Sequence, residues 1–284
     1  MKKLSLGAYI FTRTTIFVAL IVLLLPLLWI FSLSLRLPDE VFESYLFLIP
    51  KHLTFQNYII AFKYTKDYLN IGFPKMYLNS FIVTIATIIL TVIIAPLGAF
   101  ALSNYQFRGR NFIYTVILAT FMLPAQVLLI PLFIMYKKLH ILNTYLTVIL
   151  PYTIFTVPIS MLILRGFFNG IPRELKEVAK IDGASDFIYF LKIAIPISKP
   201  AIATCIIWSF PIIWNEFSMA LVFLGKDQLK TLPVAIATIG GGQYIVPYNI
   251  FAASMMICII PILIIFLAFQ KWFIKGTTAG ALKG

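Results

Sequence analysis

The sequence predicts an all-α polytopic membrane protein with six transmembrane helices. Of its 284 residues, 61% are apolar and only 12% are charged, whereas water-soluble domains carry about twice that share of charge. The mean hydropathy of +0.97 is accordingly strongly positive. Six runs of the chain are also long and apolar enough to cross about 30 Å of hydrocarbon at about 1.5 Å per helical residue. Lipid is therefore the expected solvent for most of the chain.

The six expected spans alternate with short charged connections. The first span follows basic residues, as the apolar part of a signal peptide does. Its 22 uncharged residues are too many for such a segment, and no A-x-A cleavage motif follows it, so we expect an uncleaved first helix. The spans are expected at residues 14–35, 77–103, 112–136, 141–164, 200–224 and 249–270.

The distribution of positive charge predicts the orientation of the chain. If the N-terminus is cytoplasmic, the cytoplasmic segments contain 14 of the 23 Lys and Arg residues. Cytoplasmic loops of membrane proteins carry such an excess of basic residues. We therefore expect a multi-pass protein of the cell (inner or plasma) membrane with both termini inside, including a cytoplasmic tail at residues 271–284.

The residue types that support cofactor or metal chemistry are scarce. Cys205 and Cys258 both lie in apolar runs, and His52 and His140 are the only histidines. No phosphate-binding loop or dinucleotide fingerprint is present. The net charge of +13 is spread over short clusters beside the spans, which does not indicate a nucleic-acid partner. We expect no metal, no cofactor, no covalent catalysis and no ATP binding by this chain.

The connection at residues 165–199 is too polar to span a membrane and predicts two short helices. In the first, Pro172 suits the first helical position and Glu174 suits the positive end of the helix dipole. Asp182 and Gly183 are expected to end this helix, because glycine adopts the left-handed conformation of a helix C-terminus without strain. The predicted apolar face of this helix consists of Leu175, Val178 and Ala179.

The second predicted helix of this connection is also amphipathic. Phe187, Phe190, Leu191 and Ala194 have the i, i+3, i+4, i+7 spacing of a single helical face. Pro196 is expected to close this helix. Two short amphipathic helices between two spans indicate a docking element.

The spacing of small and acidic residues in this connection is distinctive. Glu177-Val178-Ala179 is followed by Gly183 and then, after nine residues, by Ile193-x-Ile195-Pro196. This pattern resembles the EAA loop of permease subunits in binding-protein-dependent ABC importers. The chain as a whole is similar to sugar-importer permeases of the maltose-transport G-subunit type. Further motifs that carry this resemblance are Asn79-Ser80, Phe107-Arg108-Gly109, Arg165-Gly166-Phe167-Phe168, Trp214-Asn215-Glu216-Phe217 and Gly280-Ala281-Leu282-Lys283-Gly284.

The resemblance implies a type I importer permease fold over residues 1–284 as a single domain. It also implies that the chain forms half of a heterodimeric sugar pore with a second permease subunit. Two cytoplasmic ATPase subunits, which hold the ATP and magnesium, and an extracytoplasmic sugar-binding protein would complete the importer. Val178 departs from the family's usual small alanine. The residues that the resemblance assigns to ATPase coupling are Glu174, Leu175, Glu177, Val178, Ala179, Asp182, Gly183 and Ala184.

The physics of the first loop helix agrees with this assignment. An apolar face with a charged rim suits a helix that lies in the groove of a partner protein. The alternative is an amphipathic helix that rests on lipid headgroups, and the EAA spacing favours the ATPase partner.

Glu216 is the only ionisable residue in an expected span. Such residues usually face a cavity or a partner, and Trp208, Trp214 and Asn215 beside it could line a sugar pathway. Two structural alternatives stay open. Glu216 and Trp214 could lie near the outer interface, or Glu216 could pair with a cation of a loop.

The resemblance also implies that Gly280, Lys283 and Gly284 of the tail contact the ATPase, although small-residue ends are ordinarily frayed. Two other function classes are disfavoured by the residues. An ion-coupled secondary transporter usually has several intramembrane ionisable groups or repeated broken helices, and only Glu216 is found. A membrane-embedded enzyme would need a catalytic constellation, which the spans lack.

Overall fold

The computed structural model describes residues 6–42, 48–241 and 247–281. Helices and their connections account for all of these residues, and no strand occurs in them. Two compact units make up the chain. One contains Met1–Phe73 with Ala235–Ile260, and the other contains Pro74–Val234 with Pro261–Gly284. The all-α prediction is confirmed.

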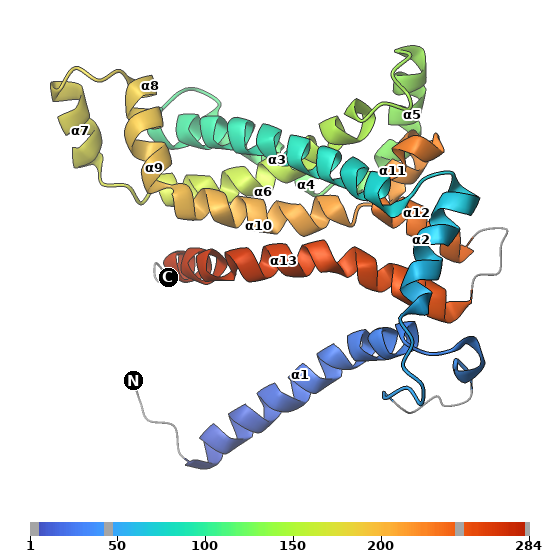
Figure 1. The fold of residues 1–284 in the computed structure, drawn as a ribbon. Helices are drawn as coiled ribbons and strands as arrows, with labels where there is room; N and C mark the ends of the chain where they lie inside the picture. The colour runs from blue at the N-terminus through green and yellow to red at the C-terminus, as the bar shows by residue number, and fades with distance from the viewer. Residues whose placement is uncertain (1–5, 43–47, 242–246, 282–284) are drawn as a thin grey trace. The chain divides into compact units, whose positions relative to one another are not determined.

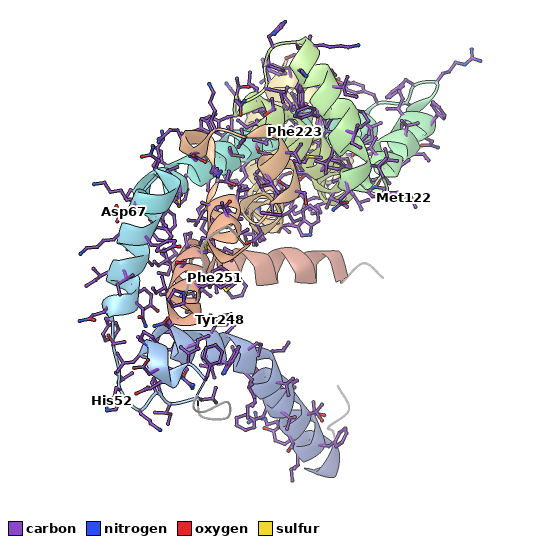
Figure 2. The ribbon with its side chains drawn as sticks, turned by 90° about the vertical axis from the view of Figure 1, so that its right-hand side faces the viewer. His52, Asp67, Met122, Phe223, Tyr248 and Phe251 are labelled. Atoms are coloured by element: carbon purple, nitrogen blue, oxygen red, sulfur yellow. The ribbon has the colours of Figure 1, made fainter. Side chains whose placement is uncertain are left out.

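The first unit contains helix α1 (Leu6–Ser34), the short turn η1 (Pro38–Glu40) and helix α2 (Gln56–Leu69). Parts of α12 (Leu232–Gly241) and α13 (Tyr248–Ala281) complete it. Figure 2 shows Asp67 on α2 and Tyr248 at the beginning of α13.

Buried asparagines hold the helix ends of the first unit together. The side-chain amide of Asn57 donates to the backbone carbonyls of Ser34 and Arg36 at 2.9 and 2.8 Å. The amide of Asn249, at the start of α13, donates to the Oδ1 atom of Asn57 at 2.9 Å. These bonds satisfy carbonyl groups that the end of α1 leaves without intrahelical partners.

The second unit is built on three long apolar helices that lie lengthwise beside one another in Figure 1. They are α3 (Phe73–Asn104), α6 (Leu146–Phe168) and α10 (Lys199–Trp214). Thr91 on α3 and Thr156 on α6 share a hydrogen bond of 2.7 Å between their hydroxyls, which satisfies two polar groups within an apolar interface.

The two ends of this helical body carry different elements. Helices α7 (Arg173–Ile181), α8 (Asp186–Tyr189) and α9 (Ile195–Ile197) lie at one end. Helices α5 (Leu129–Lys138) and α11 (Ser218–Phe223) lie at the opposite end (Figure 1). The loop helices α7–α9 and the break between α10 and α11 therefore lie at opposite ends of the bundle.

Four of the described helices are long and apolar enough to cross a membrane, and the number rises to six if two bent helix pairs each form one span. The bent pairs interrupt or extend the uncharged runs that the sequence predicts as spans. The expected span 112–136 is divided into α4 (Arg110–Phe121), the turn η2 (Ala125–Leu128) and α5, with a bend of 88°. Pro124 stands at this break, where proline disfavours a helical conformation of the preceding residue.

The expected span 200–224 is also interrupted. Helix α10 ends at Trp214, Asn215 caps it, and the short helix α11 begins at Ser218. A second bend of 71° separates α8–α9 from α10 at its other end. The polar pair Asn215-Glu216 therefore lies in a break between helices.

Candidate functional site

Helix α7 has the boundaries that its sequence predicts, to within one residue. Pro172 is the N-cap rather than the first helical residue, with φ −56° and ψ 135°. At the other end Gly183 has φ +79°. The Gly183 amide donates to the Lys180 carbonyl at 3.0 Å, and the Ala184 amide donates to the Ala179 carbonyl at 2.9 Å. These two bonds form a Schellman motif, which requires the left-handed glycine.

The predicted apolar face of α7 is divided between two surroundings. Ala179 is buried, with 5% exposure, whereas Leu175 and Val178 are 41% and 55% exposed. The expectation of one shared face is wrong in this respect. Ile181, which is not part of the predicted face, is 84% exposed. Leu175, Val178 and Ile181, at i, i+3 and i+6, form an exposed apolar stripe.

The opposite side of α7 is fixed to α8 by charge. The Nζ atom of Lys176 lies 3.3 Å from Oδ1 of Asp186, and that of Lys180 lies 3.8 Å from the same atom. The hydroxyl of Tyr105 donates to Oδ2 of Asp186 at 2.8 Å. This hydrogen bond and the nearby lysine charges hold the pKa of Asp186 below its ordinary value. This link could not be predicted from the sequence, because its members come from three separate segments.

The second loop helix differs from its prediction. The segment runs as α8, a wide π-helical turn η3 (Phe190–Ala194) and α9. Phe190 and Ala194 are buried, whereas Phe187 and Leu191 are exposed, so the four do not share one face. A π-turn changes the side-chain period and commonly accommodates a local irregularity.

Pro196 was expected to close this helix, but it lies within α9, and the chain bends at Ser198 instead. Pro196 lacks a backbone N–H, so it cannot donate to the preceding turn, which is the π-helical η3.

An aromatic cluster connects the loop to the long helices. The ring of Phe100 on α3 lies 5.8 Å from Phe168 on α6 and 4.9 Å from Phe190 in the π-turn. The Tyr189 ring lies 6.1 Å from Phe100, and Ala179 of α7 belongs to the same buried cluster. Edge and tilted ring pairs of this kind contribute about 0.5–1.5 kcal/mol each beyond their area. Ala179 of α7 therefore packs in the same buried cluster as residues of α3 and α6.

The Glu216 region lies at the far end of the unit. Glu216 accepts hydrogen bonds from the backbone amides of Met219 at 2.9 Å and Ala220 at 3.2 Å, in the first turn of α11. It also accepts a short hydrogen bond from the hydroxyl of Tyr152 on α6. Among the described residues, no loop cation pairs with Glu216. The carboxylate joins α6 to the start of α11, where the helix dipole favours negative charge.

The aromatic residues predicted beside Glu216 do not form one open surface. Trp214 is only 2% exposed and stacks on Phe210 at 5.3 Å between ring centroids. Trp208 lies earlier on α10 and is half-buried, whereas Asn215 is exposed at the break. The structure therefore brings Trp214, Asn215 and Glu216 together and places Trp208 apart from them. Gly280 lies in the last turn of α13, and Lys283 and Gly284 lie outside the described residues.

Comparison with known proteins identifies the family. The family described as "Binding-protein-dependent transport system inner membrane component" matches residues 94–278. The chain belongs to this permease family. The matched range includes both α7 and the α10–α11 break, and it makes the permease a multi-pass inner-membrane component of an importer with ATPase and binding-protein components.

Individual relatives agree over nearly the whole chain. The permease is 34% identical over 262 residues to the trehalose transport system permease protein SugB of Mycobacterium tuberculosis, covering 92% of this chain and 93% of that protein. It is also 34% identical over 264 residues to the trehalose/maltose transport system permease protein MalG of Thermococcus litoralis, covering 93% of each.

A solved structure shares the fold of the permease. The crystal structure of a bacterial ABC transporter involved in the import of the acidic polysaccharide alginate contains a chain that is 25% identical. That chain superposes with a TM-score of 0.81, over 96% of this chain and 100% of the matched one. The predicted importer-permease fold is confirmed.

Proposed function

We propose that the permease forms one half of a heterodimeric sugar pore and that α7 is the element on which a cytoplasmic ATPase subunit docks. The observation that carries this proposal is the exposed stripe of Leu175, Val178 and Ile181 on a helix whose other side is fixed in place. A rigid amphipathic helix with an open apolar stripe fits the groove of a partner protein. ATP and magnesium would be bound by that partner.

Charged residues border the apolar stripe. Glu174 and Glu177 are both exposed on α7, and within the described part of the chain neither makes an ion pair. Carboxylates at the rim of an interface contribute mainly to partner choice and association rate. Ala179 and Ala184 contribute to docking indirectly. They pack the C-terminal turn of α7 and the residue after Gly183 against the buried cluster, which holds α7 in place.

The coupling path follows from this packing. When the ATPase subunits close, a force on α7 reaches α3 and α6 through Ala179, Phe100 and Phe168. It reaches α10 through the π-turn and the bend at Ser198. The long helices then reorient about the bound sugar. At the far end of the unit, Asn215 is the exposed polar residue among those predicted to line the sugar pathway. Glu216 stabilises the break between α10 and α11 in which Asn215 lies.

The sugar class is supported by the relatives. The names of the two relatives described above specify trehalose and trehalose with maltose. These substrates share a glycosidic linkage and many hydroxyls, so the cargo of this permease is a disaccharide or a related glycoside. Both termini are cytoplasmic in this proposal, which places α7 and the end of α13 on the ATPase side.

Reconstituted transport tests the proposal against the secondary-transporter alternative. The permease is assembled in vesicles with its second permease, ATPase and binding protein, and labelled trehalose and maltose are offered. Uptake that requires ATP, stops with vanadate and survives a protonophore supports an ABC importer. Uptake without ATP that a protonophore abolishes would identify an ion-coupled transporter instead.

A further inference from the structure

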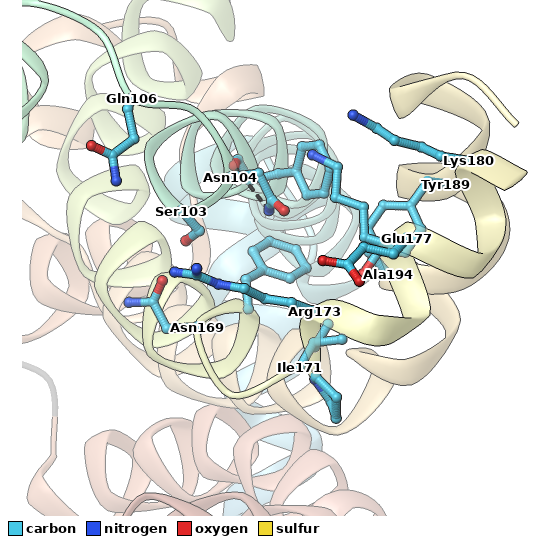
Figure 3. Close-up of a pocket in the computed structure, with 14 residues that line it drawn as sticks. Ser103, Asn104, Gln106, Asn169, Ile171, Arg173, Glu177, Lys180, Tyr189 and Ala194 are labelled. Atoms are coloured by element: carbon cyan, nitrogen blue, oxygen red, sulfur yellow. Dashed lines mark hydrogen bonds between the residues drawn. The ribbon is translucent and has the colours of Figure 1, made fainter.

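A polar pocket of about 390 Å³ lies between α7 and the ends of α3 and α6 (Figure 3). Its volume falls in the range of small-ligand sites. The α7 side contributes Arg173, Lys176 and Lys180. The ends of the two long helices and the following loop contribute hydrogen-bonding groups from Ser103, Gln106 and Asn169.

Of the three cations that line the pocket, Arg173 is the one for which the described residues provide no ion pair. Within the described part of the chain it has neither a carboxylate partner nor an aromatic one. Figure 3 shows its side chain extending across the pocket toward Ser103 and Asn169. Lys176 differs, because Asp186 already neutralises much of its charge at 3.3 Å. The guanidinium of Arg173 is thus available for a bidentate contact with an anion.

The opposite wall presents hydrogen-bond donors to the same space. The Ser103 hydroxyl is buried and has no partner among the described residues. Burial of an unpartnered hydroxyl is unfavourable, and a ligand in the pocket would supply the missing hydrogen-bond partner. Gln106 and Asn169 supply amide groups at the mouth. Arg173 is also the first residue of the nine-residue α7, so the positive end of that helix dipole faces the pocket.

Two carboxylates limit the positive potential. Glu177 lines the pocket beside Arg173, Lys176 and Lys180, and Asp186 is paired with the two lysines behind it. Three cations, Arg173, Lys176 and Lys180, thus face two carboxylates, Glu177 and Asp186, which leaves a net positive charge. The pocket therefore favours an anion over a cation.

We propose that this pocket binds a phosphate group, carried by an anionic phospholipid headgroup or by a soluble phosphate. A guanidinium opposed to a hydroxyl and two amides matches the tetrahedral acceptor oxygens of phosphate. The site lies where α3 and α6 end, and basic pockets at such positions bind anionic headgroups. A phosphate held here would contact both α7 and α3 and would limit the movement of α7.

The test measures lipid retention by the purified full-length chain. The protein is taken from nanodiscs of equal parts phosphatidylglycerol and phosphatidylcholine, and native mass spectrometry counts the lipids that stay bound. Wild-type protein is expected to retain phosphatidylglycerol preferentially. Arg173→Gln should lower that preference roughly tenfold, the value of about one charge-assisted hydrogen bond. Lys192→Gln makes the same charge change on an exposed position of the same loop outside the pocket, and it should change nothing.

Two further measurements complete the test. Inorganic phosphate at about 10 mM distinguishes the sources: displacement of the lipid identifies a site that also takes soluble phosphate, and no displacement identifies a headgroup site. Ser103→Ala keeps all charges and should lower the retention of phosphatidylglycerol roughly threefold. This variant replaces Arg173→Gln in the test if Arg173→Gln does not fold. The proposal would be overturned if Arg173→Gln and Lys192→Gln lost phosphatidylglycerol equally. It would also be overturned if the wild-type protein showed no lipid preference and no effect of phosphate. This assay contains no ATPase subunit. A negative result would therefore overturn the phosphate site without bearing on the proposed docking of the ATPase on α7.

Discussion

The Nζ atom of Lys176 lies 3.3 Å from Oδ1 of Asp186, and this ion pair joins α7 to α8. The side chains of the two residues are 18% and 29% exposed, so water screens the pair only in part. The same carboxylate accepts the Tyr105 hydroxyl, which comes from the loop after α3. One carboxylate therefore ties the proposed docking helix to two other segments.

The pH dependence of this link has a defined sign. Because folding lowers the pKa of Asp186 from its ordinary value of 3.8, the stabilisation is complete above about pH 4–5 and is lost as the pH falls through the folded-state pKa. Asp186→Asn should lower the melting temperature at neutral pH. The difference from wild type should shrink below about pH 4. A difference of the same size at pH 7 and pH 3 would show that the carboxylate charge does not contribute.

The left-handed turn at Gly183 predicts a graded mutant series. Among the described residues, no heavy atom lies within 4 Å of the position that a Cβ atom would take there, so a substitution acts through its backbone conformation alone. Gly183→Val should cost at least about 1–2 kcal/mol and shift the end of α7, with loss of ATPase on co-purification. Gly183→Asn should be much milder, because asparagine tolerates the left-handed region.

Gly166, on α6, provides the control for this series. It too has open space around it, but its φ is not positive. Gly166→Ala should retain the ATPase and should not lower stability. If Gly183→Val retained the ATPase and coupled uptake as well as Gly166→Ala did, the turn would have no part in docking.

The Tyr152–Glu216 contact separates a structural role from a pathway role. Glu216→Ala removes the carboxylate at the start of α11, at a cost of about 0.5–2 kcal/mol. Tyr152→Phe removes one donor, at a cost of about 0.5–1.5 kcal/mol. A double-mutant cycle on thermal stability should show that the two costs are not additive. Transport should fall only as far as the amount of assembled complex falls. Full assembly with abolished transport in Glu216→Ala alone would instead assign Glu216 to the sugar pathway.

Removal of residues 276–284 tests the tail. Helix α13 continues to Ala281, so the deletion shortens a helix and removes the last three residues. Membrane insertion should be unchanged, because the apolar candidate span ends at Ala268. Sugar-stimulated ATP hydrolysis by the complex should fall if the tail contacts the ATPase. Unchanged stimulation of ATP hydrolysis would show that the tail is a frayed end without a contact to the ATPase.

Local signals in the sequence predicted the loop helix well. Pro172 and the Asp182-Gly183 pair determine where α7 begins and ends through short-range backbone preferences, and these act in any tertiary setting. The uncharged runs likewise predicted α3 and α6. The 14-residue α2 lies in a mixed polar segment, and hydropathy alone gave no signal for it.

Long-range pairings could not be predicted in the same way. Tyr152 and Glu216 are 64 residues apart, and Tyr105 and Asp186 are 81 residues apart. Their meeting depends on how α3, α6 and α10 pack. Pro124 inside the expected span 112–136 predicts a kink there. The size of the bend between α4 and α5, 88°, could not be predicted, because Met122 and Leu123 continue an apolar run and composition does not distinguish a kinked helix from a broken one.

Capture of the ATPase by the exposed stripe of α7 tests directly whether α7 is the docking helix. Val178→Asp places a carboxylate in the middle of that stripe, where Val178 is 55% exposed, so the chain itself should fold and insert normally. Leu139→Ser, at a 58% exposed position beside α5 at the opposite end of the unit, is the matched control. Val178→Asp is expected to lose at least about nine-tenths of the co-purifying ATPase, whereas Leu139→Ser should retain it. Full retention of the ATPase by Val178→Asp would contradict the assignment of α7 as the docking helix.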